Sequence, residues 1–139
     1  MPSKLPYLLD DQIGYVLRRV TQRHLVIFSD SIPSITTTQF AVLARLDQMG
    51  PLSQNLLGRE TAMDAATIKG VVDRLSKQGL VTTAADPTDR RRLTVTLTDQ
   101  GSALFTSTQD AATGVSSQTL APLSKPEQAR LLALLGRLV

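Results

Sequence analysis

Two segments in the middle of the chain follow each other with different spacings of apolar residues. The first has the three- and four-residue spacing of one helix face, at Ile68, Val71, Val72 and Leu75. The second, residues 93–97, alternates leucine and valine with threonine, which is the two-residue repeat of a half-buried strand. Residues 80–84 are also β-prone, and turn-forming residues 86–89 separate them from the second strand. This order predicts a helix over residues 65–78 followed directly by a β-hairpin with a charged tip.

Residues that favour helix N-termini mark where further helices begin. They are Thr36, Ser53, Asp64, Thr98 and Ser124. Two of these caps are followed at the third position by Gln39 and Glu127, which is the spacing of a capping box. With the apolar spacing, the caps predict helices over residues 5–32, 36–49, 53–59, 65–78, 99–120 and 125–138. The fold class expected is therefore mainly α with one small β-hairpin.

The first expected helix has an apolar stripe on one side and arginines on the other. The stripe consists of Leu9, Ile13, Val16, Leu17, Val20, His24, Ile27 and Phe28. The polar face holds Arg18, Arg19 and Arg23. We interpret His24 as a core or interface histidine, and a ligand contact is the alternative.

The composition excludes several classes of protein. A chain of 139 residues fits one domain, and no run approaches the roughly 18 apolar residues that span a bilayer, so we expect no membrane partner. With no cysteine and one histidine, the chain has no disulfide and no thiolate or histidine-rich metal site. The N-terminal residues lack a signal-peptide pattern, so we expect a cytoplasmic protein. No phosphate loop, nucleophile elbow or His–acid–nucleophile set is recognisable, so we expect neither enzyme activity nor a cofactor.

Two short helices joined by a tight turn and followed by a hairpin form a winged helix-turn-helix. The second helix of such a pair enters the DNA major groove with its N-terminal residues toward the base edges. Here those residues are Ala65, Ala66, Thr67 and Lys69. The hairpin tip carries Arg90, Arg91 and Arg92. Arginines on such a loop fit a narrow minor groove, and the alternative interpretation is a solvated basic turn.

Two motifs in this part of the chain resemble the MarR family of bacterial transcriptional regulators. Residues 86–91, Asp-Pro-Thr-Asp-Arg-Arg, followed by Val-Thr-Leu-Thr at 95–98 and by Gly101, resemble the wing signature of that family. Val-Asp-Arg-Leu at 72–75, followed by Gly-Leu-Val at 79–81, is similar to the end of its recognition helix. Because both motifs occur at the expected separation and in the expected order of elements, the resemblance covers nearly the whole chain.

The resemblance implies a homodimer that binds a palindromic operator in double-stranded DNA. Residues 5–33 and 99–139 would form a helical dimerisation region, and residues 36–98 the winged helix-turn-helix. The resemblance also implies a repressor that leaves DNA when it binds a small phenolic or aromatic acid. Residues 13–24 resemble members linked to the breakdown of aromatic compounds.

The resemblance also implies roles for single residues. Arg91 matches the wing arginine that enters the minor groove, Asp89 matches the acid that orients the wing by pairing with an arginine, and Arg74 matches an arginine near a DNA phosphate. Gly70 departs from the pattern, because many members carry arginine there on the recognition helix, and this suggests close packing or close approach to DNA. Thr37 also departs, since it replaces a common proline at the start of the second helix.

The candidate effector site is expected on the first two helices. Arg18 or Arg19 would grip an effector carboxylate through two hydrogen bonds, or would instead be solvated or bridge the dimer. We interpret Tyr15 and Phe40 as core aromatic rings, and the alternative is that they line the effector pocket together with His24. A different class of function stays open at this point: a winged-helix module that binds a protein partner without reading a DNA sequence.

Overall fold

The computed structural model describes residues 4–139. Residues 1–3, which belong to the N-terminal stretch that lacks a signal-peptide pattern, lie outside the described part. Its elements are η1 (Leu9–Asp11), α1 (Ile13–Ser31), α2 (Thr37–Met49), β1 (Leu52–Ser53), α3 (Gln54–Glu60), α4 (Ala65–Lys77), β2 (Val81–Ala85), β3 (Leu93–Leu97), α5 (Asp99–Leu120) and α6 (Lys125–Gly136). The fold class predicted from the sequence is confirmed, since helices dominate and the only sheet in residues 4–139 is small.

The predicted helix caps are confirmed. The side chains of Thr36, Ser53, Asp64, Thr98 and Ser124 each accept a hydrogen bond from a backbone N–H in the first turn of the following helix. The helices that begin after Thr36 and Ser124 also have the full capping box, in which the side chain of the third helical residue accepts from the N–H of the cap. Because these caps act over three residues, local sequence alone is enough to place them.

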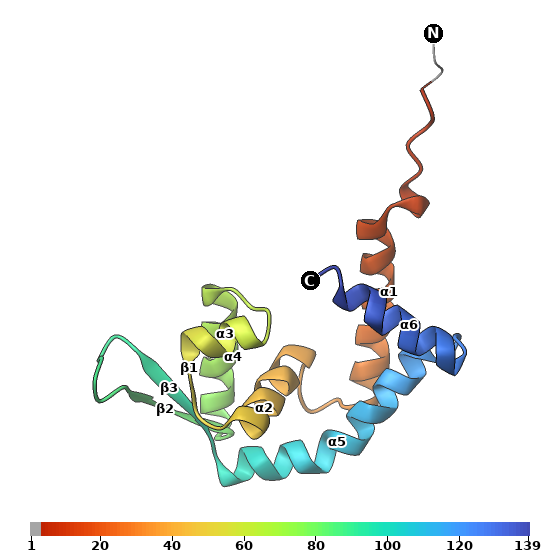
Figure 1. The fold of residues 1–139 in the computed structure, drawn as a ribbon. Helices are drawn as coiled ribbons and strands as arrows, with labels where there is room; N and C mark the ends of the chain where they lie inside the picture. Colours follow the sequence, from red (N-terminus) through yellow and green to blue (C-terminus); the bar gives the residue numbers. More distant parts are fainter. Residues whose placement is uncertain (1–3) are drawn as a thin grey trace.

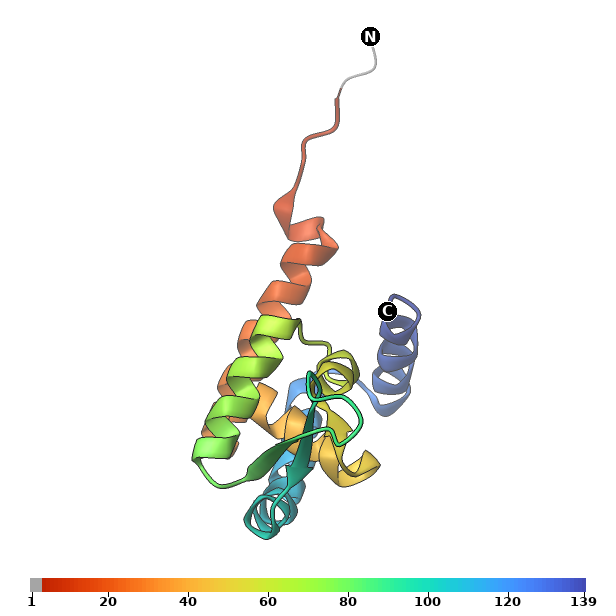
Figure 2. The same ribbon diagram turned by 90° about the vertical axis from the view of Figure 1, so that its left-hand side faces the viewer.

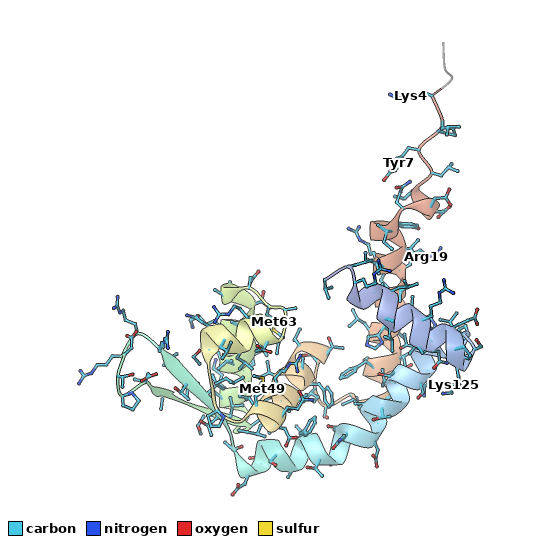
Figure 3. The ribbon with its side chains drawn as sticks, in the orientation of Figure 1. Lys4, Tyr7, Arg19, Met49, Met63 and Lys125 are labelled. Carbon is cyan, nitrogen blue, oxygen red and sulfur yellow. The ribbon has the colours of Figure 1, made fainter. Side chains whose placement is uncertain are left out.

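The start of the first helix was predicted too early. The sequence predicts a helix from residue 5, but residues 4–8 are not helical, a short 3₁₀ turn follows, and α1 begins only at Ile13. Pro6 disfavours helical backbone only in the residue before it, so it accounts for the extended Leu5 and not for the delay of the helix to Ile13. Lys4 and Tyr7 project from this extended segment, which leads away from the rest of the chain (Figure 3).

The hairpin is the predicted pair of antiparallel strands, but it has a third strand beside it. β2 pairs with β3 over its whole length, from Val81 opposite Leu97 to Ala85 opposite Leu93. β1 pairs with the other edge of β3 and gives the sheet order β1-β3-β2. Sequence analysis missed β1, because a strand of two residues has no periodicity and its pairing partner lies more than 40 residues further along the chain.

The elements divide into two parts that α5 connects (Figure 1). The sheet, α2, α3 and α4 lie on the left of this view, while α1 and α6 lie on the right and α5 runs along the bottom between them. The rings of Phe28 on α1, Phe40 on α2 and Phe105 on α5 join the two parts, with centroids 6.0 and 5.5 Å apart. No helix within residues 4–139 is long and apolar enough to cross a membrane.

Candidate DNA-binding and effector sites

α4 presents one buried and one exposed face. Its apolar residues Ile68, Val71, Val72 and Leu75 are buried against the core. The sequence-predicted contacts Ala65, Ala66, Thr67 and Lys69 are all exposed. Asp64 accepts the Thr67 N–H at 2.7 Å, and this hydrogen bond lowers the pKa of the Asp64 carboxyl below its ordinary value of 3.8. The cap is therefore ionised at neutral pH, and it holds the first turn of the exposed face.

Two long side chains lie along the exposed face of α4. The Lys69 Nζ is 2.9 Å from Asp73 Oδ2, one turn further along the helix. The Arg74 guanidinium lies over Gly70, since a Cβ built on Gly70 would have Arg74 Nη1 and Nη2 at 3.5 and 3.6 Å as its nearest neighbours. Lys69 and Arg74, the two predicted DNA contacts with long cationic side chains on this helix, therefore each contact the residue four positions away.

The wing loop is organised by two aspartates. Asp86 Oδ1 accepts from the Thr88 N–H at 2.8 Å, and this hydrogen bond lowers the pKa of the Asp86 carboxyl. Asp89 Oδ1 accepts from the Arg91 N–H at 3.0 Å and lies 3.6 Å from the Arg91 Nε. The Arg91 side chain is nevertheless 95% exposed, and Arg90 and Arg92 are also exposed. The loop is thus held at its backbone while its guanidinium groups stay accessible to a ligand.

α4 and the wing belong to one surface of the molecule. α4 packs against β2. Both lie on the left-hand side of Figure 1, which is the side that faces the viewer in Figure 2. A shallow hollow at the base of the wing is lined by residues 53–55 at the start of α3 and by residues 91–93. The structure therefore brings together the recognition helix, the start of α3 and the wing arginines.

The residues predicted for an effector site are not gathered in one pocket. The Arg19 guanidinium carbon lies 6.0 Å from the centre of the Tyr15 ring, in cation–π range, and Arg19 lines a surface groove with Val16, Val20 and Arg23. Arg18 is exposed and lines none of the described grooves. The Phe40 ring lies between two other phenylalanines, as part of the aromatic cluster.

His24 lies in a second groove, and its ring contacts the C-terminal end of α5. Its Nδ1 is 2.8 Å from Thr119 Oγ1 on α5. Beside it, the Arg23 guanidinium donates to the backbone oxygens of Thr119 and Gln118 at 2.7 and 2.9 Å, and so caps the last turn of α5. The groove has a volume of about 270 Å³ and is lined by Val20, Thr21, His24, Ser116, Thr119, Leu120, Leu131, Leu132 and Leu135. Sequence analysis gave no sign that Arg23 has this structural contact.

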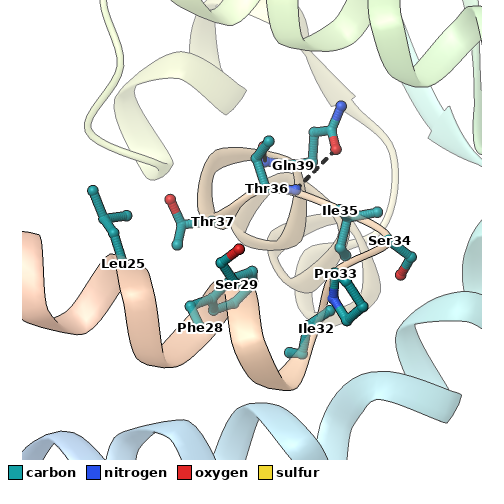
Figure 4. Close-up of a pocket in the computed structure, with 10 residues that line it drawn as sticks. All are labelled: Leu25, Phe28, Ser29, Ile32, Pro33, Ser34, Ile35, Thr36, Thr37 and Gln39. Atoms are coloured by element: carbon teal, nitrogen blue, oxygen red, sulfur yellow. Dashed lines mark hydrogen bonds between the residues drawn. The ribbon is translucent and has the colours of Figure 1, made fainter.

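A separate hollow between α1 and α2 was not predicted from the sequence. It lies at the elbow between α1 and α2, has a volume of about 320 Å³, and is lined by residues from Leu25 to Gln39 (Figure 4). Gln39 is 94% buried there, and its Oε1 accepts from the Thr36 N–H. Of its lining residues, sequence analysis gave a capping role to Thr36 and Gln39 and placed Phe28 on the apolar stripe, and no pattern in the sequence indicated a hollow here. Among residues 4–139, no group of three His, Cys, Asp or Glu side chains is placed to hold a metal ion.

The arrangement defines the class of protein as a winged helix-turn-helix. α3 and α4 are the two helices, the turn between them is residues 61–64, and β2 and β3 form the wing that directly follows. An exposed helix N-terminus and an arginine-rich loop on one surface are what a protein of this class uses to contact adjacent grooves of DNA.

Comparison with known proteins defines the family. A sequence model of the MarR family matches residues 34–92. The HTH-type transcriptional repressor NicR of Pseudomonas putida is 38% identical over 136 residues, which cover 96% of this chain and 86% of NicR. This chain belongs to the MarR family of transcriptional regulators, as its two motifs indicated.

Two solved structures are similar over almost the whole chain. A probable transcriptional regulator from Pseudomonas aeruginosa is 52% identical, with a TM-score of 0.91 over 95% of this chain and 100% of that one. Bordetella bronchiseptica BpsR, whose structure concerns the regulation of its DNA binding by 6-hydroxynicotinic acid, is 37% identical, with a TM-score of 0.92 over 96% of this chain and 97% of BpsR. The winged helix-turn-helix together with its flanking helices is therefore a shared architecture.

Proposed function

We propose that this protein is a homodimeric, sequence-specific DNA-binding repressor that a small aromatic acid releases from DNA. The observation that carries the proposal is the shared surface of α4 and the wing, where Thr67, Lys69 and Arg74 on the helix and Arg90–Arg92 on the loop are all exposed. The regulator acts by binding alone and catalyses no reaction, as is usual for a family of transcriptional regulators. Because it binds chromosomal DNA, it works in the cytoplasm.

The dimer follows from apolar side chains that one chain leaves uncovered. Ile13, Val16, Leu17 and Val20 on α1 are 40–61% exposed, and Leu132 on α6 is 59% exposed. A second copy would cover these side chains, because large exposed apolar patches commonly mark protein–protein interfaces. Two recognition helices about 34 Å apart would then contact successive major grooves on one face of a palindromic operator.

For the effector, we propose that Arg19 binds the carboxylate and that the ring occupies the grooves along α1. Val20 lines both the groove that contains Arg19 and the groove that contains His24, so the two grooves adjoin. Their walls are largely aliphatic, which suits an aromatic ring, while Arg19 at one end supplies a guanidinium for a carboxylate. Arg23 is already bonded to the end of α5, and Arg18 lines neither groove. The regulation of BpsR by an aromatic acid supports this class of ligand.

The DNA-binding proposal is tested by the salt dependence of binding to duplex DNA. Neutralisation of several phosphates gives a steep fall of log affinity with log salt, with a slope of about −0.9 for each phosphate contact. We expect Arg91→Ala to weaken binding to all sequences and to make the slope less steep by about 1. Arg130→Ala, which removes the same charge from exposed α6, is the matched control and should change neither. If the binding of the wild-type protein to DNA does not depend on salt, the result would instead fit a module that binds a protein partner.

The effector proposal is tested by thermal shift with 6-hydroxynicotinic acid and related aromatic acids. A ligand that binds the folded state raises the melting temperature according to its concentration relative to its dissociation constant. We expect Arg19→Ala to raise the ligand concentration needed for a given shift roughly 10- to 150-fold, the loss of a hydrogen bond to a charged group, without a change in DNA affinity. Arg18→Ala is the matched control and should behave as wild type. Equal responses of the two variants would exclude Arg19 as the anchor.

A further inference from the structure

The two cations on the exposed face of α4 differ in how they are held. Lys69 is paired with the Asp73 carboxylate at 2.9 Å, whereas the Arg74 guanidinium makes no hydrogen bond or ion pair within residues 4–139 and rests on Gly70. We propose that Arg74, and not Lys69, reads a base pair in the major groove, and that the small residue at position 70 leaves the space in which its guanidinium lies. This inference deepens the proposed DNA-binding function and rests on it.

The position of the guanidinium supports a role at the base edges. Arg74 belongs to the last turn of α4, but its guanidinium atoms are the nearest neighbours of a Cβ built on Gly70, one helical turn closer to Asp64. Helical side chains generally lean toward the helix N-terminus, and one turn corresponds to about 5.4 Å along the axis. The N-terminal half of a recognition helix is the part that faces base edges. The side chain thus carries its charge from the end of the helix toward the base-reading part.

The chemistry of the two side chains points the same way. A guanidinium with all its donors free can form two parallel hydrogen bonds to the O6 and N7 acceptors of guanine, which is the commonest specific contact to a base. The ammonium of Lys69 lies beside a carboxylate, and the side chains of Lys69 and Asp73 are 67% and 55% exposed. The pair carries no net charge, and a DNA acceptor has to compete with Asp73 for the ammonium. Lys69 is therefore the weaker candidate for reading a base.

The small size of residue 70 leaves room for this position of Arg74. Apart from the backbone of the helix itself, the three nearest atoms to a built Cβ all belong to the Arg74 guanidinium. At 3.5–3.9 Å they are in ordinary van der Waals contact, so an alanine fits without moving the arginine. A leucine would extend into the volume that the guanidinium occupies. Gly70→Ala and Gly70→Leu therefore form a matched pair, because both improve the helix propensity of the position and only the second displaces Arg74.

The experiment selects duplexes from a library of random sequences with wild-type protein and then measures variants on the selected duplex, on its single-base-pair variants and on an unselected duplex. We expect Arg74→Lys and Gly70→Leu to lose preference for a G·C pair at one position by roughly 5- to 150-fold. Both variants keep the positive charge, so their affinity for the unselected duplex and their salt dependence should match wild type. Gly70→Ala and Lys69→Ala should keep the base preference. Circular dichroism and a melting curve for each variant verify the fold.

Three outcomes would count against the assignment, and they are distinguishable. If Arg74→Lys retains the preference while Lys69→Ala loses it, Lys69 reads the base, Arg74 contacts a phosphate, and the DNA-binding function itself stands. If wild-type protein selects no sequence and its binding does not depend on salt, the proposed function fails and this assignment fails with it. A uniform loss of affinity across all duplexes in Gly70→Leu would also count against a positioning role for Gly70.

Discussion

Large apolar side chains are mostly buried in the winged region, residues 36–98, and mostly exposed along α1 and α6. In the winged region, Val42, Leu43, Leu57, Val72, Leu75 and Val95 have no exposed surface. Along α1 the only buried residue is Phe28, and α6 has no buried residue at all. The two regions have similar kinds of side chain, so the difference lies in what covers them.

This difference shows which part of the fold is complete in one chain. The winged region supplies most of the buried core, and Phe28, Ile32 and Ile35 before it and Phe105 and Val115 on α5 complete that core. The helices α1 and α6 each need a second layer, and a single chain supplies part of it for α1 through α5. The reading surface is therefore built inside one protomer, while the spacing between two reading surfaces depends on the contact between protomers. An effector in the α1 grooves would act on that contact.

The sharpest way to test the comparison is to create a cavity in the winged region. Leu43→Ala removes a fully buried side chain from α2, and we expect the free energy of unfolding to fall by about 2–5 kcal/mol. Met49→Ala, on the same helix but 46% exposed, is the matched control and should cost much less. Urea denaturation measures both. Equal costs for the two variants would show that the winged region does not have a tightly packed core.

A substitution on the exposed stripe of α1 should act in a different way. Leu17 is 41% exposed in one chain, so burial of that remaining surface in a dimer would contribute about 1 kcal/mol for each side chain. We expect Leu17→Ala to weaken dimerisation and to make the melting temperature depend more steeply on protein concentration. Sedimentation at several concentrations measures the dimer directly, with Gln22→Ala on the same helix as the control. A monomer–dimer equilibrium unchanged by Leu17→Ala would place the interface elsewhere.

Features that depend on residues close in sequence were predictable. Each helix cap acts within three residues, so Thr36, Asp64 and Ser124 could be identified from residue type and spacing alone. The hairpin was predictable for the same reason, because alternation in residues 93–97 and the turn formers before it are local. The exposure of Lys69 and Thr67 also followed, since helix periodicity determines which face is buried.

Features that join distant segments were not predictable. Arg23 bonds to the backbone of Thr119, 96 residues further on, and no local pattern distinguishes this arginine from Arg18 or Arg19. The strand β1 exists only because β3 passes beside it. The positions of the long side chains on α4 could not be predicted either. Lys69 pairs with Asp73 and Arg74 lies over Gly70, and both positions depend on side-chain rotamers and not on residue type. These are the contacts on which the proposals for the effector and for base reading depend.

The junction between the two regions allows a smaller and more specific test. Thr98 caps α5 where β3 ends, and its Oγ1 accepts from the Gly101 N–H at 3.0 Å and donates to the Gly79 oxygen at 2.7 Å. We expect Thr98→Ala to lower the free energy of unfolding by about 1 kcal/mol, the usual cost of a lost N-cap. Thr98→Ser should retain most of the stability, and Thr106→Ala, an exposed site within α5, should cost little.

The same variant tests whether the two regions unfold together. Both tyrosines, Tyr7 and Tyr15, lie at or before the start of α1, so tyrosine fluorescence reports on the helical side while circular dichroism reports on the whole chain. If α5 couples the regions, Thr98→Ala should shift both denaturation curves equally and they should stay coincident. Separate midpoints would show that the winged region unfolds without α1. An effector bound along α1 would then need another route to the reading surface, because a junction that does not couple stability cannot transmit a difference in binding free energy.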